Sequence, residues 1–338
     1  MKPKEIFLRA LKRESVPRPA AGSATSVITV DLMEKVGVYF PDAHLDAEKM
    51  AALAGAGYTE LGFDNVMPLF SVWHESSALG CSVDWGEMGR MPDSRGKIYA
   101  IDDEITVPAD LLEQQGTKVP LDALKILKKR FGDEIAIVGK VFGPWTMGYH
   151  LFGVEEFLIN TLLKPDAVKR AMDTLKEVTV AFAKAQIDAG ADALCYADHA
   201  TRDLCSPQAY NEFLTDLHEE MKERIPCPLI LHICGDTSDR ICFIKKTGIP
   251  CFHFDSKIDS ENPSKKAREL AGEKLALMGG TSNFDVIIKG TPETIANDVK
   301  EKIDNGIDII GPECAVPLNA PYKNMKLLAE LAKNASPG

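Results

Sequence analysis

The sequence predicts an α/β fold, a (β/α)₈ TIM barrel, in a single domain that spans residues 1–338. From residue 130 onward, short apolar runs rich in β-branched residues alternate with amphipathic helical stretches, the pattern of repeated βαβ units and a parallel sheet. A chain of 338 residues accommodates about eight such units, which favours closure into a barrel. An open doubly wound sheet would more often carry a GxGxxG loop, and the sequence has none.

The regular part of the chain contains six predicted strands and three well-marked helices. The strands are expected at 135–139, 193–197, 228–233, 251–254, 275–279 and 308–311. One helix places Val168, Met172, Leu175, Val178 and Phe182 on one face through spacings of three and four residues. A second begins at the Ser206-Pro207 cap and continues to Met221, and a third runs from Thr291-Pro292 to Gly306.

The first third of the sequence is less regular. A basic amphipathic start predicts a short first helix, followed by strands at 18–26 and 60–64 and by helices near 29–37 and 46–57. Residues from about 66 to 118 lack clear periodicity and predict an irregular excursion, with a hairpin at 80–99 laid against the barrel.

Composition and charge exclude several classes of function. The formal net charge is −11, and no cluster of basic residues is large enough for a nucleic-acid or membrane surface. No apolar run approaches the roughly 18 residues of a membrane span, and the N-terminus does not read as a secretory signal. The eight scattered cysteines are typical of reduced thiols, so we expect a cytoplasmic protein.

Three residues at predicted strand ends form a candidate metal site. His232 and Cys234 are two residues apart, a spacing that puts both side chains on the same face of a strand. Cys314 follows a later strand, and the carboxyl ends of all barrel strands share one face. Two thiolates and one imidazole suit Zn²⁺ and leave a fourth position open, which is typical of catalytic zinc. The alternative is a His232 bonded to a backbone carbonyl beside two buried cysteines.

Two aspartates at neighbouring strand ends are candidate catalytic residues. Asp198 or Asp255 is expected to accept a proton or to orient His232, and Asp255 is also a candidate fourth metal ligand. Asp198 could instead cap a helix. His199 and His253 lie near the same face and are expected to be structural or supporting residues.

The segment after Gly143-Pro144 carries three large apolar residues. Trp145, Met147 and Tyr149 are expected to line an apolar pocket that binds the cofactor, although helix packing explains them equally well.

Several phrases resemble the uroporphyrinogen decarboxylase superfamily, and the resemblance runs over essentially the whole chain. They are KEIFLRALKRESVPRP, GPWTMGYHLFG, SPQAYNEF and GTPETIANDVKEKID. Within that superfamily, LHICGDT and the later GPECAVPLNAP resemble the zinc-dependent corrinoid:coenzyme M methyltransferases and their bacterial relatives. The true decarboxylases carry an arginine-bearing phrase similar to MRQAGR after the first strand, where this chain has GSATSVITV.

The resemblance implies a zinc enzyme that uses His232, Cys234 and Cys314 as ligands. It implies methyl transfer between methylcobalamin, carried by a partner corrinoid protein, and a thiol such as coenzyme M. One departure is the Pro312-Glu313-Cys314-Ala315 surround, which is glycine-rich in the methanogen enzymes, so another small acceptor stays open. Three alternatives remain: a demethylase of a small methylated substrate, a tetrapyrrole lyase that lacks the expected arginines, and a non-catalytic corrinoid-binding or structural zinc protein.

Overall fold

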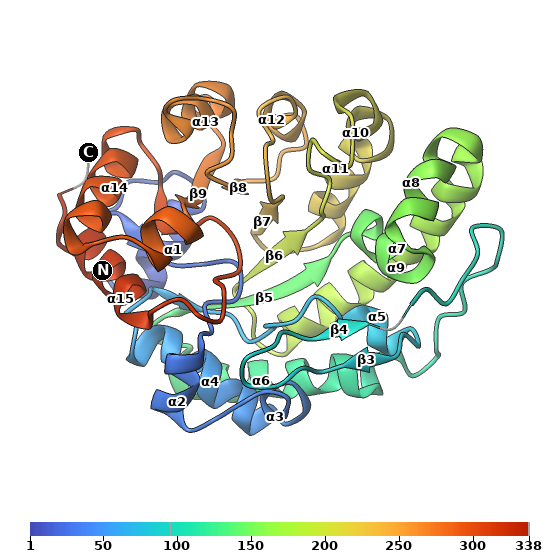
Figure 1. The fold of residues 1–338 in the computed structure, drawn as a ribbon, viewed down its shortest axis with the longest axis horizontal. Helices are drawn as coiled ribbons and strands as arrows, with labels where there is room; N and C mark the ends of the chain where they lie inside the picture. The colour runs from blue at the N-terminus through green and yellow to red at the C-terminus, as the bar shows by residue number, and fades with distance from the viewer. Residues whose placement is uncertain (95, 337–338) are drawn as a thin grey trace.

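Eight strands form one parallel sheet in the computed structural model, which describes residues 1–94 and 96–336. The order of the strands is β1-β10-β9-β8-β7-β6-β5-β2, and the helices surround them (Figure 1). The predicted (β/α)₈ barrel is confirmed. The strands are β1 (Ala20–Ala21), β2 (Asn65–Val66), β5 (Ala136–Phe142), β6 (Ala193–Ala197), β7 (Leu229–His232), β8 (Cys251–Phe254), β9 (Ala276–Thr281) and β10 (Ile309–Pro312).

The two ends of this order, β1 and β2, are joined by a few hydrogen bonds. The backbone N–H of Asp64 donates to the Ala21 carbonyl (2.7 Å). The Asn65 side chain accepts from the Ser23 N–H (3.1 Å) and donates to the Ser23 carbonyl (2.8 Å). These bonds bring the ring of strands nearly to closure, so all eight carboxyl ends face the same side.

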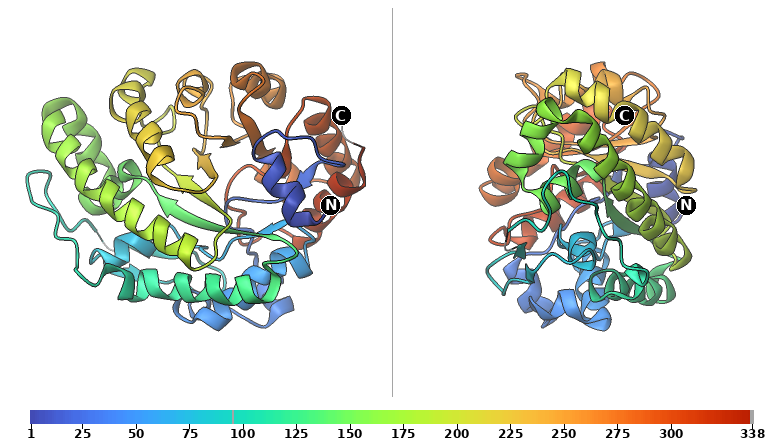
Figure 2. Two further views of the ribbon diagram at one scale, coloured as in Figure 1. Left: turned by 180° about the vertical axis from the view of Figure 1, so that it is seen from behind. Right: turned by 90° about the vertical axis from the view of Figure 1, so that its right-hand side faces the viewer.

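Helices cover the outside of the sheet. The long helix α9 runs along the back of the strands, as Figure 2 shows, and none of the helices in the described residues has both the length and the apolar character of a membrane span. The helices are α1 (Pro3–Ala10), α2 (Val30–Val36), α3 (Asp42–Leu45), α4 (Ala47–Thr59), α5 (His74–Ala78), α6 (Gln115–Phe131), α7 (Pro144–Phe152), α8 (Val154–Leu163), α9 (Pro165–Asp188), α10 (Pro207–Phe213), α11 (Thr215–Arg224), α12 (Ile241–Ile244), α13 (Pro263–Ala271), α14 (Pro292–Asp304) and α15 (Tyr322–Asn334), with a 3₁₀ turn η1 (Leu111–Glu113) and a π turn η2 (Asn283–Ile288).

The segment between β2 and α6 holds little regular structure. It contains α5, η1 and a short antiparallel hairpin of β3 (Val83–Asp84) and β4 (Asp93–Ser94). The hairpin falls within the predicted range of 80–99, of which residue 95 lies outside the described residues.

Two predicted elements differ from the structure. Residues 60–64 form a turn after α4, because the N–H of Phe63 bonds back to the Gly57 carbonyl (2.9 Å), and the strand begins only at Asn65. The single helix predicted from Ser206 to Met221 is two helices, α10 and α11. The break falls at Leu214, whose φ of −121° is not helical.

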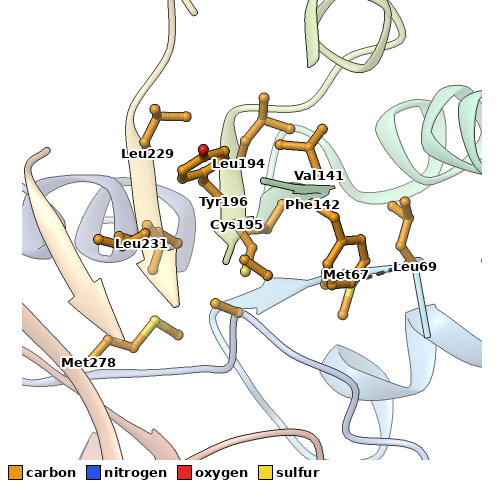
Figure 3. Packing of buried hydrophobic residues seen from close by; sticks show 14 of the residues in the cluster. Met67, Leu69, Val141, Phe142, Leu194, Cys195, Tyr196, Leu229, Leu231 and Met278 are labelled. Carbon is orange, nitrogen blue, oxygen red and sulfur yellow. Dashed lines mark hydrogen bonds between the residues drawn. The ribbon is translucent and has the colours of Figure 1, made fainter. Parts of the chain in front are cut away.

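The core is built from both faces of the strands. Leu194 and Tyr196 of β6 alternate with Cys195, so neighbouring side chains point to opposite faces of the sheet (Figure 3). Tyr196 packs edge-on against His218 of α11, with ring centroids 5.2 Å apart. The other face of the strands points into the barrel, where Phe142 lines a cavity at the carboxyl ends.

Candidate metal centre

Three donor atoms converge where β7 and β10 end. His232 is the last residue of β7, Cys234 follows two residues later, and Cys314 comes two residues after the end of β10. The His232 Nε2 lies 3.0 Å from the Cys234 Sγ and 3.4 Å from the Cys314 Sγ. The two sulfurs are 2.9 Å apart although 80 residues separate them in the chain. All three donor atoms therefore lie within 4.8 Å of one another.

This donor set has the chemistry of a zinc site. Zinc binds thiolate sulfur at about 2.3 Å and imidazole nitrogen at about 2.0 Å, which places two sulfur ligands of a tetrahedral ion about 3.8 Å apart. The two sulfurs are 2.9 Å apart, so they would have to move apart by about 1 Å to bind the ion. Rotation of the cysteine side chains can supply that movement, so the three residues could hold zinc.

The contact between the two cysteines shifts their pKa values in opposite directions. A hydrogen bond from the Cys234 thiol lowers the pKa of Cys314 well below the ordinary thiol value, and the neighbouring His232 adds to the effect. The same hydrogen bond and burial raise the pKa of Cys234 well above that value. The protein thus favours one thiolate, and a bound divalent cation would favour two.

A backbone carbonyl orients His232. Its Nδ1 donates to the carbonyl oxygen of His253 on β8 (3.3 Å), which leaves Nε2 to face the sulfurs. The Nε2 of His253 in turn donates to the carbonyl of Pro312, two residues before Cys314 (2.8 Å). Burial lowers the pKa of His253 to about 3, so this ring is neutral. The backbone carbonyl of His253 therefore orients His232, which is the role that the sequence analysis expected of an aspartate.

Asp198 lies at the cavity wall but is fully engaged elsewhere. Its Oδ1 accepts from the backbone N–H of Thr146 (2.8 Å) and from the Thr146 hydroxyl (3.0 Å). Its Oδ2 lies 3.3 Å from the Nε2 of His218. Because Thr146 is in the first turn of α7, this carboxylate caps that helix from the end of β6. A Cβ on Gly143 would lie 2.2 Å from the same carboxylate, so glycine is needed there.

Asp255 fixes the loop that carries Cys234. Its Oδ2 accepts from the Gly235 N–H (2.8 Å) and its Oδ1 from the Lys257 N–H (3.0 Å). Within the described residues, the cluster of possible metal ligands comprises the histidine and the two cysteines without Asp255.

A buried carboxyl that the sequence analysis missed lies beside the last ligand. Glu313 accepts from the Asn283 N–H (2.9 Å) and from the backbone and hydroxyl of Ser256. Burial raises the pKa of Glu313 to about 7, and the charge of Asp255 adds to this rise. Its place directly before Cys314 was the only sequence signal.

The donor set opens onto a cavity of about 360 Å³. Of the three predicted pocket residues, Tyr149 lines this cavity, whereas Trp145 and Met147 are buried elsewhere. Trp145 packs edge-on against Phe157 of α8 (5.2 Å between ring centroids), so helix packing explains it. The full lining consists of Thr25, Val72, Trp73, Lys140, Phe142, Thr146, Tyr149, His150, Val154, Ala197, Asp198, His199, His232, Cys234, Cys314 and Ala315.

The chain is similar to known proteins over almost its whole length. The family model described as uroporphyrinogen decarboxylase (URO-D) matches residues 2–335. A methylated-thiol–coenzyme M methyltransferase of Methanosarcina mazei is 33% identical over 306 residues, which are 90% of this chain and 82% of that protein. A methylcobamide:CoM methyltransferase of Methanosarcina acetivorans is 30% identical over 98% of both chains. The solved structure of a methyltransferase from Methanosarcina mazei superposes with a TM-score of 0.94 at 31% identity, covering 98% of both chains.

Proposed function

The chain belongs to the uroporphyrinogen decarboxylase family, and from that premise we propose that it transfers a methyl group between a corrinoid and the thiol of coenzyme M at a zinc ion. It is a methyltransferase, like the relatives that cover nearly all of its length. We assign the metal to His232, Cys234 and Cys314.

One observation carries this proposal: a histidine and two cysteines from two separate strand ends meet on the wall of a cavity. Residues from β7 and β10 have no structural need to bring two thiols within 2.9 Å of each other, because burial alone would satisfy a cysteine. A structural zinc site would be closed by four protein ligands. The cavity beside these three donors instead supports an open position for a substrate thiol.

A zinc ion held there would supply a Lewis acid that keeps a substrate thiol deprotonated near neutral pH. Residues of the chain position the metal ligands and form the walls of the cavity. His253 orients the His232 ring, Asp255 holds the Gly235 backbone beside Cys234, and Phe142 and Tyr149 provide apolar walls that exclude water. In this arrangement Asp198 caps α7 and Asp255 holds the loop of Cys234, and proton acceptance by either aspartate stays a prediction.

The transfer itself balances without a further reactant. The thiolate sulfur attacks the methyl carbon of methylcobalamin, and the cobalt–carbon bond breaks with both electrons going to cobalt. The products are a methyl thioether and cob(I)alamin, and the thiol proton leaves to solvent. A partner corrinoid protein would present the methylcobalamin at the mouth of the barrel.

The alternatives have less support. A decarboxylating lyase needs cationic groups for the substrate carboxylates, and the segment GSATSVITV offers none. A non-catalytic zinc protein would not need a cavity of about 360 Å³ beside its ligands. Eight cysteines that are all free of disulfides support the cytoplasmic location expected from the sequence.

An assay with methylcobalamin tests the proposal directly. Purified zinc-loaded protein is incubated with methylcobalamin and coenzyme M, and formation of cob(I)alamin and methyl-coenzyme M is followed. We expect turnover that is lost on chelation and restored by zinc. Tetrahydrofolate and homocysteine serve as alternative acceptors. Absence of methyl transfer to any thiol by a protein that contains zinc would refute the proposed reaction.

A further inference from the structure

Lys140 is a buried lysine inside the barrel. It lies on β5, its residue is 4% exposed, and its side chain lines the same cavity as the three metal-binding candidates. Its backbone is fixed from both sides by Gln186 of α9, which accepts from the Lys140 N–H (2.8 Å) and donates to the Lys140 carbonyl (2.7 Å). The side chain is therefore held on the cavity wall by the strand and by the helix behind it.

This ammonium group has no anionic partner within ion-pair distance in the part of the chain that the structure describes. Its Nζ makes no hydrogen bond and no ion pair there, and its close neighbour is the ring of Phe142, 4.7 Å from Nζ to the centroid. Lys302 provides the contrast, since it is also 4% exposed but pairs with Asp298 (2.8 Å) and Glu301 (3.0 Å). A buried cation without an anion is costly, so an unpaired lysine at a cavity wall indicates an anion supplied from outside the chain.

Groups near the cavity do not fill this need. Glu75 is buried, but its Oε1 accepts from the Phe142 N–H (2.8 Å), and it lies beyond ion-pair distance of Lys140. Burial raises the pKa of Glu75 to about 7, although the Lys140 charge lowers it, so the carboxyl is often protonated. The charges of Zn²⁺ and of two thiolate ligands cancel, so a metal site that holds zinc would not neutralise the charge of Lys140.

We propose that Lys140 binds the anionic head group of the acceptor thiol and thereby selects short thiols that carry a sulfonate or a carboxylate over neutral thiols. This inference rests on the proposed methyl transfer, and it assigns a specificity role to a residue outside the metal set. The cavity volume of about 360 Å³ is at the small end for ligand pockets, which fits a compact acceptor. A sulfur bound near Cys234 and Cys314 and an anion bound at Lys140 would orient such a molecule at both ends.

The test compares two thiols that differ only in the head group. Coenzyme M carries a sulfonate on a two-carbon thiol, and 2-mercaptoethanol carries a hydroxyl in its place. We expect Lys140→Met to lower the ratio of kcat/KM for coenzyme M over 2-mercaptoethanol about 10- to 100-fold, mainly through KM, because a charged hydrogen bond is lost. Lys140→Arg should retain most of the preference. Lys97→Met is the control, since it removes an exposed lysine that pairs with Glu156 outside the cavity.

A binding measurement separates this inference from the proposed reaction. Calorimetric titration with coenzyme M and with ethanesulfonate, which has the head group but no thiol, should show affinity that falls about 10- to 100-fold in Lys140→Met. Lys140→Gln provides the same comparison if the methionine variant does not fold. Ethanesulfonate binding that depends on Lys140 would support the inference even if no thiol is methylated. Equal loss of activity with both thiols, or sulfonate binding unchanged by the substitution, would overturn it.

Discussion

His232 and His253 lie side by side on neighbouring strands, with ring centroids 4.5 Å apart, and the backbone carbonyl of His253 accepts the Nδ1 proton of His232 (3.3 Å). This hydrogen bond fixes the tautomer of His232, so that the lone pair of Nε2 points toward the two sulfurs. The strand pairing of His232 with His253 sets the geometry, because the two residues are register partners between β7 and β8. The sheet therefore positions the metal-binding nitrogen directly.

The first prediction concerns the metal ligands. Purified protein should contain about one zinc per chain, and Cys234→Ala and Cys314→Ala should each lose most of it, because a zinc site with three protein ligands cannot spare one. Metal analysis by mass spectrometry provides the measurement. Cys242→Ala is a matched control, since Cys242 is exposed and lies outside the cluster of possible metal ligands. Retention of zinc by both ligand variants would contradict the assigned site.

Much of the fold was predictable from sequence periodicity. The six strands expected after residue 130 all occur, with ends shifted by up to three residues. The largest shift is in β5, where the apolar pattern breaks at Gly139-Lys140 but the strand continues to Phe142. Lys140 faces the cavity at this point of the strand, and a pattern of apolar residues cannot reveal a buried cation. The split of the predicted helix at Leu214 was also invisible, because its apolar stripe continues across the break.

The three metal-binding candidates could be predicted from the sequence, whereas the residues that support them mostly could not. A two-residue spacing on a strand and a cysteine at another strand end were enough to place His232, Cys234 and Cys314 together. The supporting contacts depend on backbone carbonyls and on side chains from distant loops, which leave no pattern in the sequence. Glu313 and Lys140 therefore emerged only from the structure.

Replacement of Asp198 by asparagine should destabilise the protein without removing the metal. The carboxylate caps α7 through Thr146 and faces His218, and asparagine keeps one acceptor oxygen but turns an amide N–H₂ toward one of these partners. We expect a loss of about 1.5–3 kcal/mol in the free energy of unfolding, measured by urea denaturation, with an unchanged zinc content. A variant of normal stability that has lost turnover would instead assign Asp198 to the reaction.

Burial of His74 should make the stability depend on pH in acid. Burial, with a smaller contribution from the Lys140 charge, lowers the pKa of His74 to about 3 from 6.5 in the unfolded chain. Below pH 6.5 His74 becomes protonated in the unfolded chain but stays neutral in the folded protein. The free energy of unfolding therefore falls as the pH falls toward 3. Between pH 6.5 and about pH 4.5 this single residue should cost about 2 kcal/mol.

Comparison with His74→Gln isolates this effect. The glutamine amide can still donate to the Gly116 carbonyl, which accepts from the His74 Nδ1 (3.1 Å). Glu75 has a raised pKa and contributes the opposite slope, which is present in both proteins and cancels in the difference. Urea denaturation at several pH values should show the wild type losing more stability than the variant on acidification. Parallel curves for the two proteins would mean that His74 is protonated in the folded state.

The final prediction tests whether the support of the metal-binding histidine matters for the metal. Gly279 of β9 has φ +90°, and a Cβ there would lie 2.4 Å from Cδ2 and 2.6 Å from Nε2 of His253. Gly279→Ala should therefore displace the His253 ring from its packing against the His232 ring (4.5 Å between centroids) and from its bond to the Pro312 carbonyl, and weaken zinc binding about 10- to 100-fold in a chelator competition. Gly62→Ala is the matched control, because Gly62 also has a positive φ (+77°) but open space around its Cβ position. Both substitutions carry the backbone cost of a left-handed alanine, about 1 kcal/mol. The crowding of the His253 ring and of the Pro312 carbonyl (2.9 Å from the same Cβ) distinguishes them. Equal zinc affinity in the two variants would show that the ring of His232 does not depend on its neighbour.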